Sequence, residues 1–319
     1  MVKMKKLKMA VIGAGFWGRN HIRVLSELPQ ADLVAICDIN KQRAEMLGEK
    51  YNINSYTDSK DLYGKEEFDA VNICVWSTNL FQKAVEALNA GKHVFVEKPM
   101  ASRVAEAEKM VETAKSEGLH LTVGFIERFN PAVRRLKEAI KEGKIGTPVS
   151  ATGKRVSKWP ERIGDVGVVK DTAIHDIDLM RFIFEEDPIS VYARAGRLRH
   201  KRFEDYAQVM LAFPDGKSAF LEANWLTPYK VRRLTVTGSE AIITVDYITQ
   251  EITIETSSQT LIPRYEWEEP LKLELQHFVD SVLNNNDPMV TGLDGVKALK
   301  IAEAILESAE KNRLIELDL

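Results

Sequence analysis

The sequence predicts an α/β protein whose N-terminal half forms a doubly wound parallel sheet and whose C-terminal half is an α+β domain with a large, mostly antiparallel sheet. Three observations support this fold class. Short apolar runs alternate with amphipathic segments over the first 125 residues, a glycine-rich turn follows the first run, and alternating strands fill much of the second half. We therefore expect two domains, residues 1–125 and 126–319.

The first half repeats one unit, a strand followed by a helix. Its apolar runs are KMAVIG, ADLVAICD, DAVNICV, KHVFVEKP and LHLTVGF, and the segments between them include INKQRAEMLGEKY, NLFQKAVEALNAG and SRVAEAEKMVETAKSEG. Runs without alternation suit strands that are buried on both faces, and helices between such strands make right-handed crossovers. The pattern therefore predicts parallel strands joined by helices.

The pattern changes after Phe125. A helix is expected from about Pro131 to Glu142, followed by a loop rich in Arg, Lys and Gly and by the helical segment DTAIHDIDL. The segments VYARAGRLR, DYAQVMLAF, SAFLEANW, VRRLTVTG, AIITVDYITQ and EITIET come next, several of them separated by turn residues such as PDG and TGS. These segments predict an antiparallel meander, and two helical stretches close the chain.

Composition excludes several classes of partner. The 319 residues include 44 basic and 47 acidic side chains with a net charge of -3, so no global field attracts nucleic acid or an anionic membrane. No apolar stretch approaches the roughly 20 residues of a membrane span, and the N-terminus lacks a signal-peptide pattern. Cys37 and Cys74 lie inside apolar runs, which predicts buried thiols and a cytoplasmic location.

The turn VIGAGFWG matches G-x-G-x-x-G at Gly13, Gly15 and Gly18. Because the motif follows a predicted strand and opens a helix, it has the context of a dinucleotide-binding Rossmann turn. Gly13 permits the tight turn, Gly15 permits close approach to a pyrophosphate, and Gly18 permits close helix packing. Phe16 and Trp17 are expected to contribute backbone amides and to cover the cofactor.

Asp38 ends the second apolar run, where it can accept hydrogen bonds from the adenosine ribose. A helix cap is the alternative role, but Asn40 is better placed for capping. A carboxylate at this position disfavours the additional phosphate of NADP, and Lys41 and Arg43 offset that repulsion only in part. We therefore expect NAD as the cofactor, with NADP less favoured.

Glu97, Lys98 and Pro99 follow a predicted parallel strand, at the sheet edge where ligands bind. Glu97 and Lys98 are therefore expected to line the cofactor, although a lysine at a strand end is often only a solvated charge. Ser77 lies on the same edge and is expected either to line the cofactor or to cap a helix. His21 is interpreted as an ordinary helix histidine.

The segment DTAIHDIDL places several polar side chains on one helical face. At about 100° per residue, Asp171, His175 and Asp178 fall within an arc of about 60°, whereas Asp176 points away. Such a face can hold a substrate and relay its proton. A metal site and a capped, solvated helix are the alternatives, and crowding of the third ligand argues against the metal.

The motifs GAGFWG, EKP and DTAIHDIDL, with Asp38 between the first two, resemble the glucose-fructose oxidoreductase, inositol dehydrogenase and MocA family over essentially the whole chain. The resemblance implies a Rossmann domain followed by a sheet-rich domain, and a site shared by Lys98, Asp171 and His175 as catalytic residues. Oxidation of an alcohol requires a base for the hydroxyl proton. We interpret Lys98 as that base, His175 as an alternative base or proton shuttle, and Asp171 as an orienting group.

Polar and basic residues on either side of this helix suggest the substrate. The segment ERFNPA carries Arg128 and Asn130, of which Asn130 precedes a proline and is equally suited to start a helix. The segment GKRVSKWPERIG carries a cluster of basic side chains that suits a diphosphate, although a solvated loop is the alternative. From this cluster we expect Arg155 and Arg162 to bind substrate, with Arg162 favoured.

Within the family, ERFNPA, NWLTPYKVRRLTVTG and VDYITQ resemble the UDP-N-acetylglucosamine 3-dehydrogenase group, which implies a 3-keto nucleotide sugar as product. Two alternatives remain open: a free polyol dehydrogenase of the inositol type, and a non-catalytic dinucleotide-binding sensor. The predicted partners are a small sugar or nucleotide sugar and further copies of the chain, as a homodimer or homotetramer built on the meander.

Overall fold

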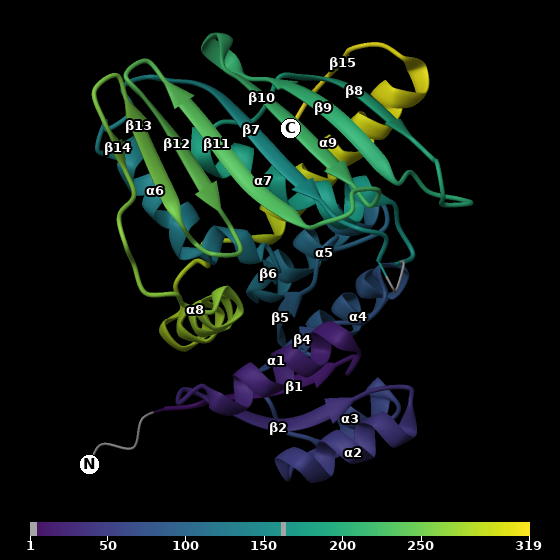
Figure 1. Cartoon of the computed structure of the whole chain (residues 1–319). Coiled ribbons are helices and arrows are strands. Elements are labelled where there is room, and N and C mark those ends of the chain that lie inside the picture. The colour runs from purple at the N-terminus through teal and green to yellow at the C-terminus, as the bar shows by residue number, and fades with distance from the viewer. Residues whose placement is uncertain (1–4, 161–163) are drawn as a thin grey trace. The chain divides into compact units, whose positions relative to one another are not determined.

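The computed structural model describes residues 5–160 and 164–319 of the chain (Figure 1). The chain forms two compact units, one of Met1–Gly124 with Leu271–Val296 and one of Phe125–Pro270 with Lys297–Leu319. The predicted boundary at residue 125 assigns residues 271–296 to the second domain. They belong to the first unit because their apolar side chains pack there, as when Phe278 contacts Phe95 with 5.6 Å between the ring centroids.

The sheet of the first unit is parallel, with the strand order β3-β2-β1-β4-β5-β6. Its strands are β1 (Leu7–Ile12), β2 (Ala31–Cys37), β3 (Asn54–Tyr56), β4 (Ala70–Ile73), β5 (His93–Val96) and β6 (Leu121–Val123). Consecutive residues of β1, β4 and β5 are buried, which confirms that these strands are covered on both faces. The strand order reverses between β1 and β4, and the carboxyl ends of the strands at such a reversal are where ligands bind.

Five helices join consecutive strands of this sheet: α1 (Phe16–Glu27), α2 (Lys41–Tyr51), α3 (Ser59–Lys65), α4 (Ser77–Asn89) and α5 (Val104–Glu117). A further helix, α8 (Pro270–Asn284), belongs to the unit through residues 271–284 and joins none of its strands. Asn40 caps α2 as expected, because its side-chain oxygen accepts a hydrogen bond of 2.9 Å from the Arg43 amide. The sequence pattern does not predict β3 or α3, since β3 is a three-residue edge strand without a buried residue.

The second unit contains a large sheet with the strand order β14-β13-β12-β11-β7-β10-β9-β8-β15. Its strands are β7 (Pro148–Val156), β8 (Ser190–Gly196), β9 (Tyr206–Ala212), β10 (Ser218–Asn224), β11 (Val231–Gly238), β12 (Ala241–Asp246), β13 (Ile252–Thr256), β14 (Thr260–Leu261) and β15 (Ile315–Glu316). The pairs are antiparallel apart from β7 with β10, which is parallel. The prediction of a mostly antiparallel sheet is thus confirmed.

Helices cover one face of the large sheet, where α6 (Pro131–Lys141), α7 (Ile174–Phe184) and α9 (Gly292–Lys311) lie (Figure 1). Asn130 and Pro131 start α6 as the sequence suggested, and the Asn130 side chain accepts a hydrogen bond from the Ala132 amide. Short turns η1 (Ile126–Phe129), η2 (Val169–Ala173) and η3 (Pro214–Gly216) complete the unit. The turn η2 is a π-helix that runs directly into α7.

Candidate active site

The glycine turn lies between β1 and α1, and its geometry requires glycine at two positions. Gly13 has a φ of +92°, and a side chain there would lie 2.6 Å from the Cys74 carbonyl oxygen. A Cβ at Gly18 would lie 1.8 Å from the Gly13 carbonyl oxygen. The α1 helix begins after Gly15 without a side-chain cap, so its first amides can bind a pyrophosphate. These features fit NAD.

Large aromatic side chains flank this turn. Phe16 and Trp17 are 63% and 44% exposed, and their rings meet edge to face with 5.8 Å between centroids. Exposed aromatic rings at the start of a dinucleotide-binding helix are in position to cover the cofactor, as the sequence analysis expected of them. Their contact with the cofactor stays a prediction.

Asp38 directly follows β2 and is only 6% exposed. Its carboxylate accepts hydrogen bonds from the Ala14 amide at 2.7 Å and the Asn40 amide at 2.8 Å. The guanidinium of Arg43 lies 3.2 Å from the same carboxylate. Asp38 is therefore held beside the glycine turn, at the position from which the sequence analysis expects it to bind the ribose, and Arg43 partly neutralises its charge.

The structure assigns His21 a partner that the sequence did not reveal. The buried imidazole lies 3.0 Å, through Nε2, from Oε1 of Glu97, and its Nδ1 lies 3.0 Å from the side-chain nitrogen Nδ2 of Asn72. The other oxygen of Glu97 accepts a hydrogen bond from the Lys98 amide at 3.2 Å. A Cβ at Gly124 would lie 3.1 Å from the Glu97 carboxylate, so Glu97 is fixed from several sides.

Lys98 and Ser77 lie on the carboxyl edge of the parallel sheet, as predicted. Lys98 is half-buried two residues after β5, and the Lys98–Pro99 peptide bond is cis. Ser77 is the first residue of α4, and its carbonyl accepts a hydrogen bond from Ser102. The N-cap position of α4 is Trp76, so Ser77 is the first residue inside the helix and not its N-cap.

The predicted catalytic residues of the second unit lie where η2 meets α7. The Ile174 amide bonds to the Val169 carbonyl, five residues back, which widens the turn that carries Asp171. Asp171 and His175 are half-buried, and the His175 ring meets Phe125 edge to face at 6.5 Å. The wide turn departs from the regular helix on which the sequence analysis placed Asp171.

Two buried arginines form ion pairs with acidic residues of α7. Arg128 of η1 donates hydrogen bonds of 2.8 and 2.6 Å to the Asp178 carboxylate. Arg155 of β7 donates two bonds of 3.0 Å to Asp176 and one of 2.9 Å to Glu127. All of these side chains except Glu127 are almost fully buried. We call these interactions the arginine clamps, because they join α7 to η1 and to the large sheet.

The arginine clamps bear on the expected substrate-binding residues. Burial opposes the charge of Arg155, but Asp176 and Glu127 outweigh it and raise its pKa, so the guanidinium stays charged. The side-chain nitrogen of Asn130 donates to the Tyr247 carbonyl at 2.9 Å. The partners of Arg128, Arg155 and Asn130 in these bonds are protein groups, and their contact with substrate stays a prediction. Arg162 lies outside the described residues.

The cysteines, the possible metal ligands and the hydropathy of the helices were also compared with expectation. Both cysteines are free; Cys37 is buried as expected, whereas Cys74 is half-buried, and burial raises the pKa of the Cys37 thiol to about 11 and that of the Cys74 thiol well above its ordinary value. Within residues 5–160 and 164–319, no group of three His, Cys, Asp or Glu side chains is arranged to hold a metal ion. No helix in the same parts of the chain has the length and hydropathy of a membrane span.

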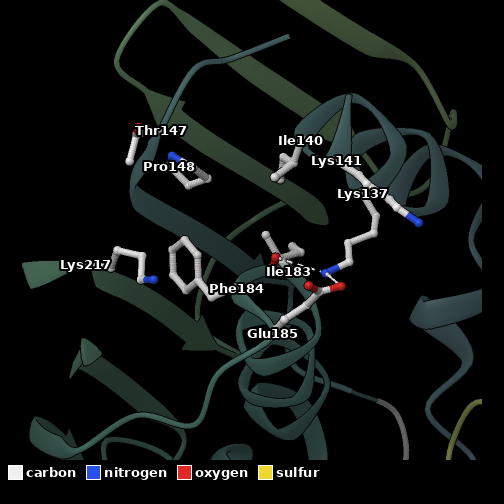
Figure 2. Close-up of a pocket in the computed structure, with 9 residues that line it drawn as sticks. All are labelled: Lys137, Ile140, Lys141, Thr147, Pro148, Ile183, Phe184, Glu185 and Lys217. Atoms are coloured by element: carbon white, nitrogen blue, oxygen red, sulfur yellow. Dashed lines mark hydrogen bonds and ion pairs between the residues drawn. The ribbon is translucent and has the colours of Figure 1, made fainter. Parts of the chain in front are cut away.

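A surface hollow lies at the C-terminal end of α7, the end opposite to Asp171 (Figure 2). Figure 2 shows lysine side chains at its rim, and Lys137 bonds there to the Phe182 carbonyl and to Glu185. The hollow contains no residue that the sequence analysis selected. Its lining is Lys137, Ile140, Lys141, Thr147, Pro148, Ile183, Phe184, Glu185 and Lys217.

Both halves of the chain match known protein families. Residues 7–125 match the model of an oxidoreductase family with an NAD-binding Rossmann fold, and residues 133–244 match the GFO/IDH/MocA C-terminal domain. The chain is 29% identical to the myo-inositol 2-dehydrogenase of Thermotoga maritima, covering 98% of this chain and 99% of that protein. It is also 29% identical to the NAD-dependent scyllo-inositol 2-dehydrogenase of Bacillus subtilis, with 98% and 97% covered.

Solved structures add a likeness of fold. The UDP-N-acetylglucosamine 3-dehydrogenase of Acidithiobacillus ferrooxidans superposes with a TM-score of 0.89 at 23% identity, covering 97% of this chain and 99% of that one. At this level of identity the similarity establishes a shared fold and leaves the substrate open.

Proposed function

Since the chain belongs to the GFO/IDH/MocA family of NAD-binding oxidoreductases, we propose that this dehydrogenase oxidises the 3-hydroxyl of a UDP-N-acetyl-hexosamine. Bound NAD supplies the hydride acceptor in such a reaction. The protein must bind the sugar, hold the alcohol carbon toward the nicotinamide, and accept the hydroxyl proton.

The placement of Lys98 is the observation that carries the catalytic assignment. It follows β5 at the carboxyl edge where the nicotinamide end of a dinucleotide is expected, and its backbone amide donates a hydrogen bond to the half-buried Glu97 carboxylate. We assign Lys98 the role of general base. His175 is an alternative base or proton shuttle, and Asp171, four residues earlier in the wide turn, orients the hydroxyls or the imidazole.

A nucleotide sugar is favoured over a neutral polyol by local charge. The β11 residue Arg232 and the preceding Lys230 are cations near Arg155, and Arg232 is also within electrostatic range of Asp171. Phosphate groups suit such an environment, whereas a cyclic polyol has no charge to offer it. The inositol-type activity is the second candidate, and the names of the T. maritima and B. subtilis relatives favour it.

Steady-state NAD reduction with a panel of UDP-N-acetylglucosamine, myo-inositol and scyllo-inositol tests the proposal. We expect turnover with the nucleotide sugar at a kcat/KM well above that of either inositol. Lys98→Met should lower kcat by about a thousandfold, because it removes the base, while NADH binding measured by fluorescence persists. Lys92→Met, at the opposite end of β5, is the matched control and should keep full activity.

Three outcomes contradict parts of this proposal. Preference for an inositol assigns the enzyme to the second candidate. Turnover of Lys98→Met near the level of the unmodified enzyme removes Lys98 from the role of base. Binding of NAD without reduction by any alcohol of a broad panel would indicate a dinucleotide-binding sensor on this fold.

A further inference from the structure

The loop between β8 and β9 concentrates positive charge in a chain of net negative charge. Residues 197–202 read RLRHKR, and we call them the basic loop. Its four arginine and lysine side chains are exposed. Within residues 5–160 and 164–319, Arg199, Lys201 and Arg202 form no ion pair with a carboxylate. The loop therefore offers cationic side chains to an outside anion.

The backbone of the basic loop is fixed by buried groups. Asp205, with no exposed surface, accepts hydrogen bonds from the amides of Leu198, Arg199 and His200 at 3.0, 2.6 and 2.8 Å. Nδ1 of His200 accepts bonds from the amides of Arg202 and Phe203 at 3.1 and 2.7 Å. Binding to a loop that is already ordered costs less conformational entropy.

This loop packs against the segment that leads to Asp171. Glu204, two residues after the loop, accepts hydrogen bonds from the Val168 amide through its carbonyl and from the Val169 amide through its carboxylate, each of 3.0 Å. Val169 begins η2, the turn that carries Asp171. Glu204 thus links the end of the basic loop to the candidate catalytic turn.

Two tryptophan rings connect the basic loop to this turn through a series of contacts. The Arg199 guanidinium lies 6.0 Å from the ring centroid of Trp159, which is half-buried. Trp159 meets Trp225 edge to face at 6.2 Å, and the Trp225 indole donates a hydrogen bond of 3.0 Å to Thr172. Trp159 therefore stands between the cationic loop and the residue next to Asp171, where a flat ring of a ligand can stack on it.

Strand register places further cations at the same end of the large sheet. Val231 pairs with Val156 at the end of β7, and Asn224 at the end of β10 pairs with Tyr206, where the strand after the basic loop begins. Burial and then the nearby Arg155 lower the pKa of Arg232 to about 10, and burial, Arg232 and Arg155 also lower that of Lys230. The positive potential at this sheet end favours a bound anion.

We propose that the basic loop and Trp159 bind the nucleoside diphosphate part of the substrate, with Arg199 and Arg202 on the phosphates and the base stacked on Trp159. The inference rests on the proposed function and adds to it the residues that select a diphosphate substrate. Guanidinium groups match phosphate oxygens in pairs, and aromatic stacking accepts a nucleobase. A neutral polyol would leave this loop without a role in binding.

We call the basic loop and Trp159 together the diphosphate anchor. Calorimetric titration of UDP into the NADH-saturated protein tests this anchor independently of turnover, since NADH blocks the cofactor site. We expect the double variant Arg199→Gln and Arg202→Gln to weaken UDP binding about tenfold or more, and increasingly so as salt is lowered. The control carries Lys141→Gln and Lys144→Gln at the end of α6, which remove the same charge from another exposed surface and should leave UDP affinity unchanged.

Kinetics provide the second readout. In the loop variant, KM for UDP-N-acetylglucosamine should rise about tenfold while kcat and KM for NAD change little, because the loop binds the substrate tail and leaves the reacting carbon untouched. Trp159→Ala should raise the KM for UDP-N-acetylglucosamine, and Trp159→Phe, which keeps an aromatic ring, should raise it less.

The outcomes separate the anchor from the substrate assignment. Failure of UDP to bind the unmodified protein, or equal affinity in the loop variant, overturns the anchor even if a nucleotide sugar is oxidised. UDP binding that depends on the basic loop, without oxidation of UDP-N-acetylglucosamine, supports the anchor and places the error in the proposed sugar.

Discussion

At the scale of single residues, Lys98 depends on a chain of buried contacts that starts at His21. Asn72 donates to Nδ1 of His21, which leaves Nε2 as the protonated nitrogen that donates to Glu97. Glu97 in turn accepts from the Lys98 amide. Since these groups are buried or half-buried, this series of hydrogen bonds restrains the backbone from which the Lys98 side chain extends.

Replacing His21 should therefore affect the rate more than the binding of NAD. His21→Ala removes the donor to Glu97, and the resulting freedom of the Lys98 backbone should lower kcat about tenfold. His21→Gln, whose amide can still donate to Glu97, should recover part of the loss. Stopped-flow hydride transfer and NADH titration provide the two readouts, and a fall in melting temperature with an unchanged rate would leave His21 a purely structural role.

At the scale of elements, α7 is held by ion pairs from two other segments. Arg128 reaches Asp178 from η1, and Arg155 reaches Asp176 from β7. Removing one partner of a buried pair leaves an uncompensated charge, whereas replacing both partners with apolar groups removes the desolvation cost as well. The arginine clamps therefore hold the helix that follows Asp171 and carries His175. Loss of one partner of a clamp should lower the stability of the fold.

Urea denaturation of Arg128 variants tests this view. Arg128→Met should cost about 3–5 kcal/mol in free energy of unfolding, because the carboxylate of Asp178, 1% exposed, loses its bidentate partner. The double variant Arg128→Met with Asp178→Leu should recover most of that loss. If Arg128→Met instead keeps the stability and raises only the substrate KM, Arg128 binds substrate as the sequence analysis expected.

The same elements show what the sequence could and could not predict. The long buried strands and the glycine turn were predictable because their patterns are local, and the edge strand β3 was missed because three half-exposed residues make no pattern. The π turn η2 depends on the loop that packs against it. The partners of Arg128 and Arg155 lie 50 and 21 residues away. A local signal existed for Arg155, which shares the buried face of β7 with Ala151 and Gly153.

At the scale of the whole molecule, one row of side chains crosses the exposed face of the large sheet. Strand register aligns residues of seven neighbouring strands from β8 to β13, and none of them is charged. The row is Tyr192, Met210, Phe220, Thr152, Thr235, Thr244 and Thr253. Tyr192, Met210 and Phe220 are 39%, 43% and 47% exposed, which forms an apolar patch at the β8 end.

We expect this face to pair with the same face of a second copy, because an uncharged row of three apolar and four threonine side chains can meet its own copy under twofold symmetry without burying a charge. Phe220→Glu should then shift the chain from a dimer or tetramer toward the monomer in light scattering at micromolar concentration, since it buries two carboxylates near the symmetry axis. Met46→Glu, on an apolar residue of α2 that is 55% exposed, is the control and should leave the mass unchanged. A monomer for the unmodified chain, or an undisturbed oligomer for Phe220→Glu, would place any subunit contact elsewhere.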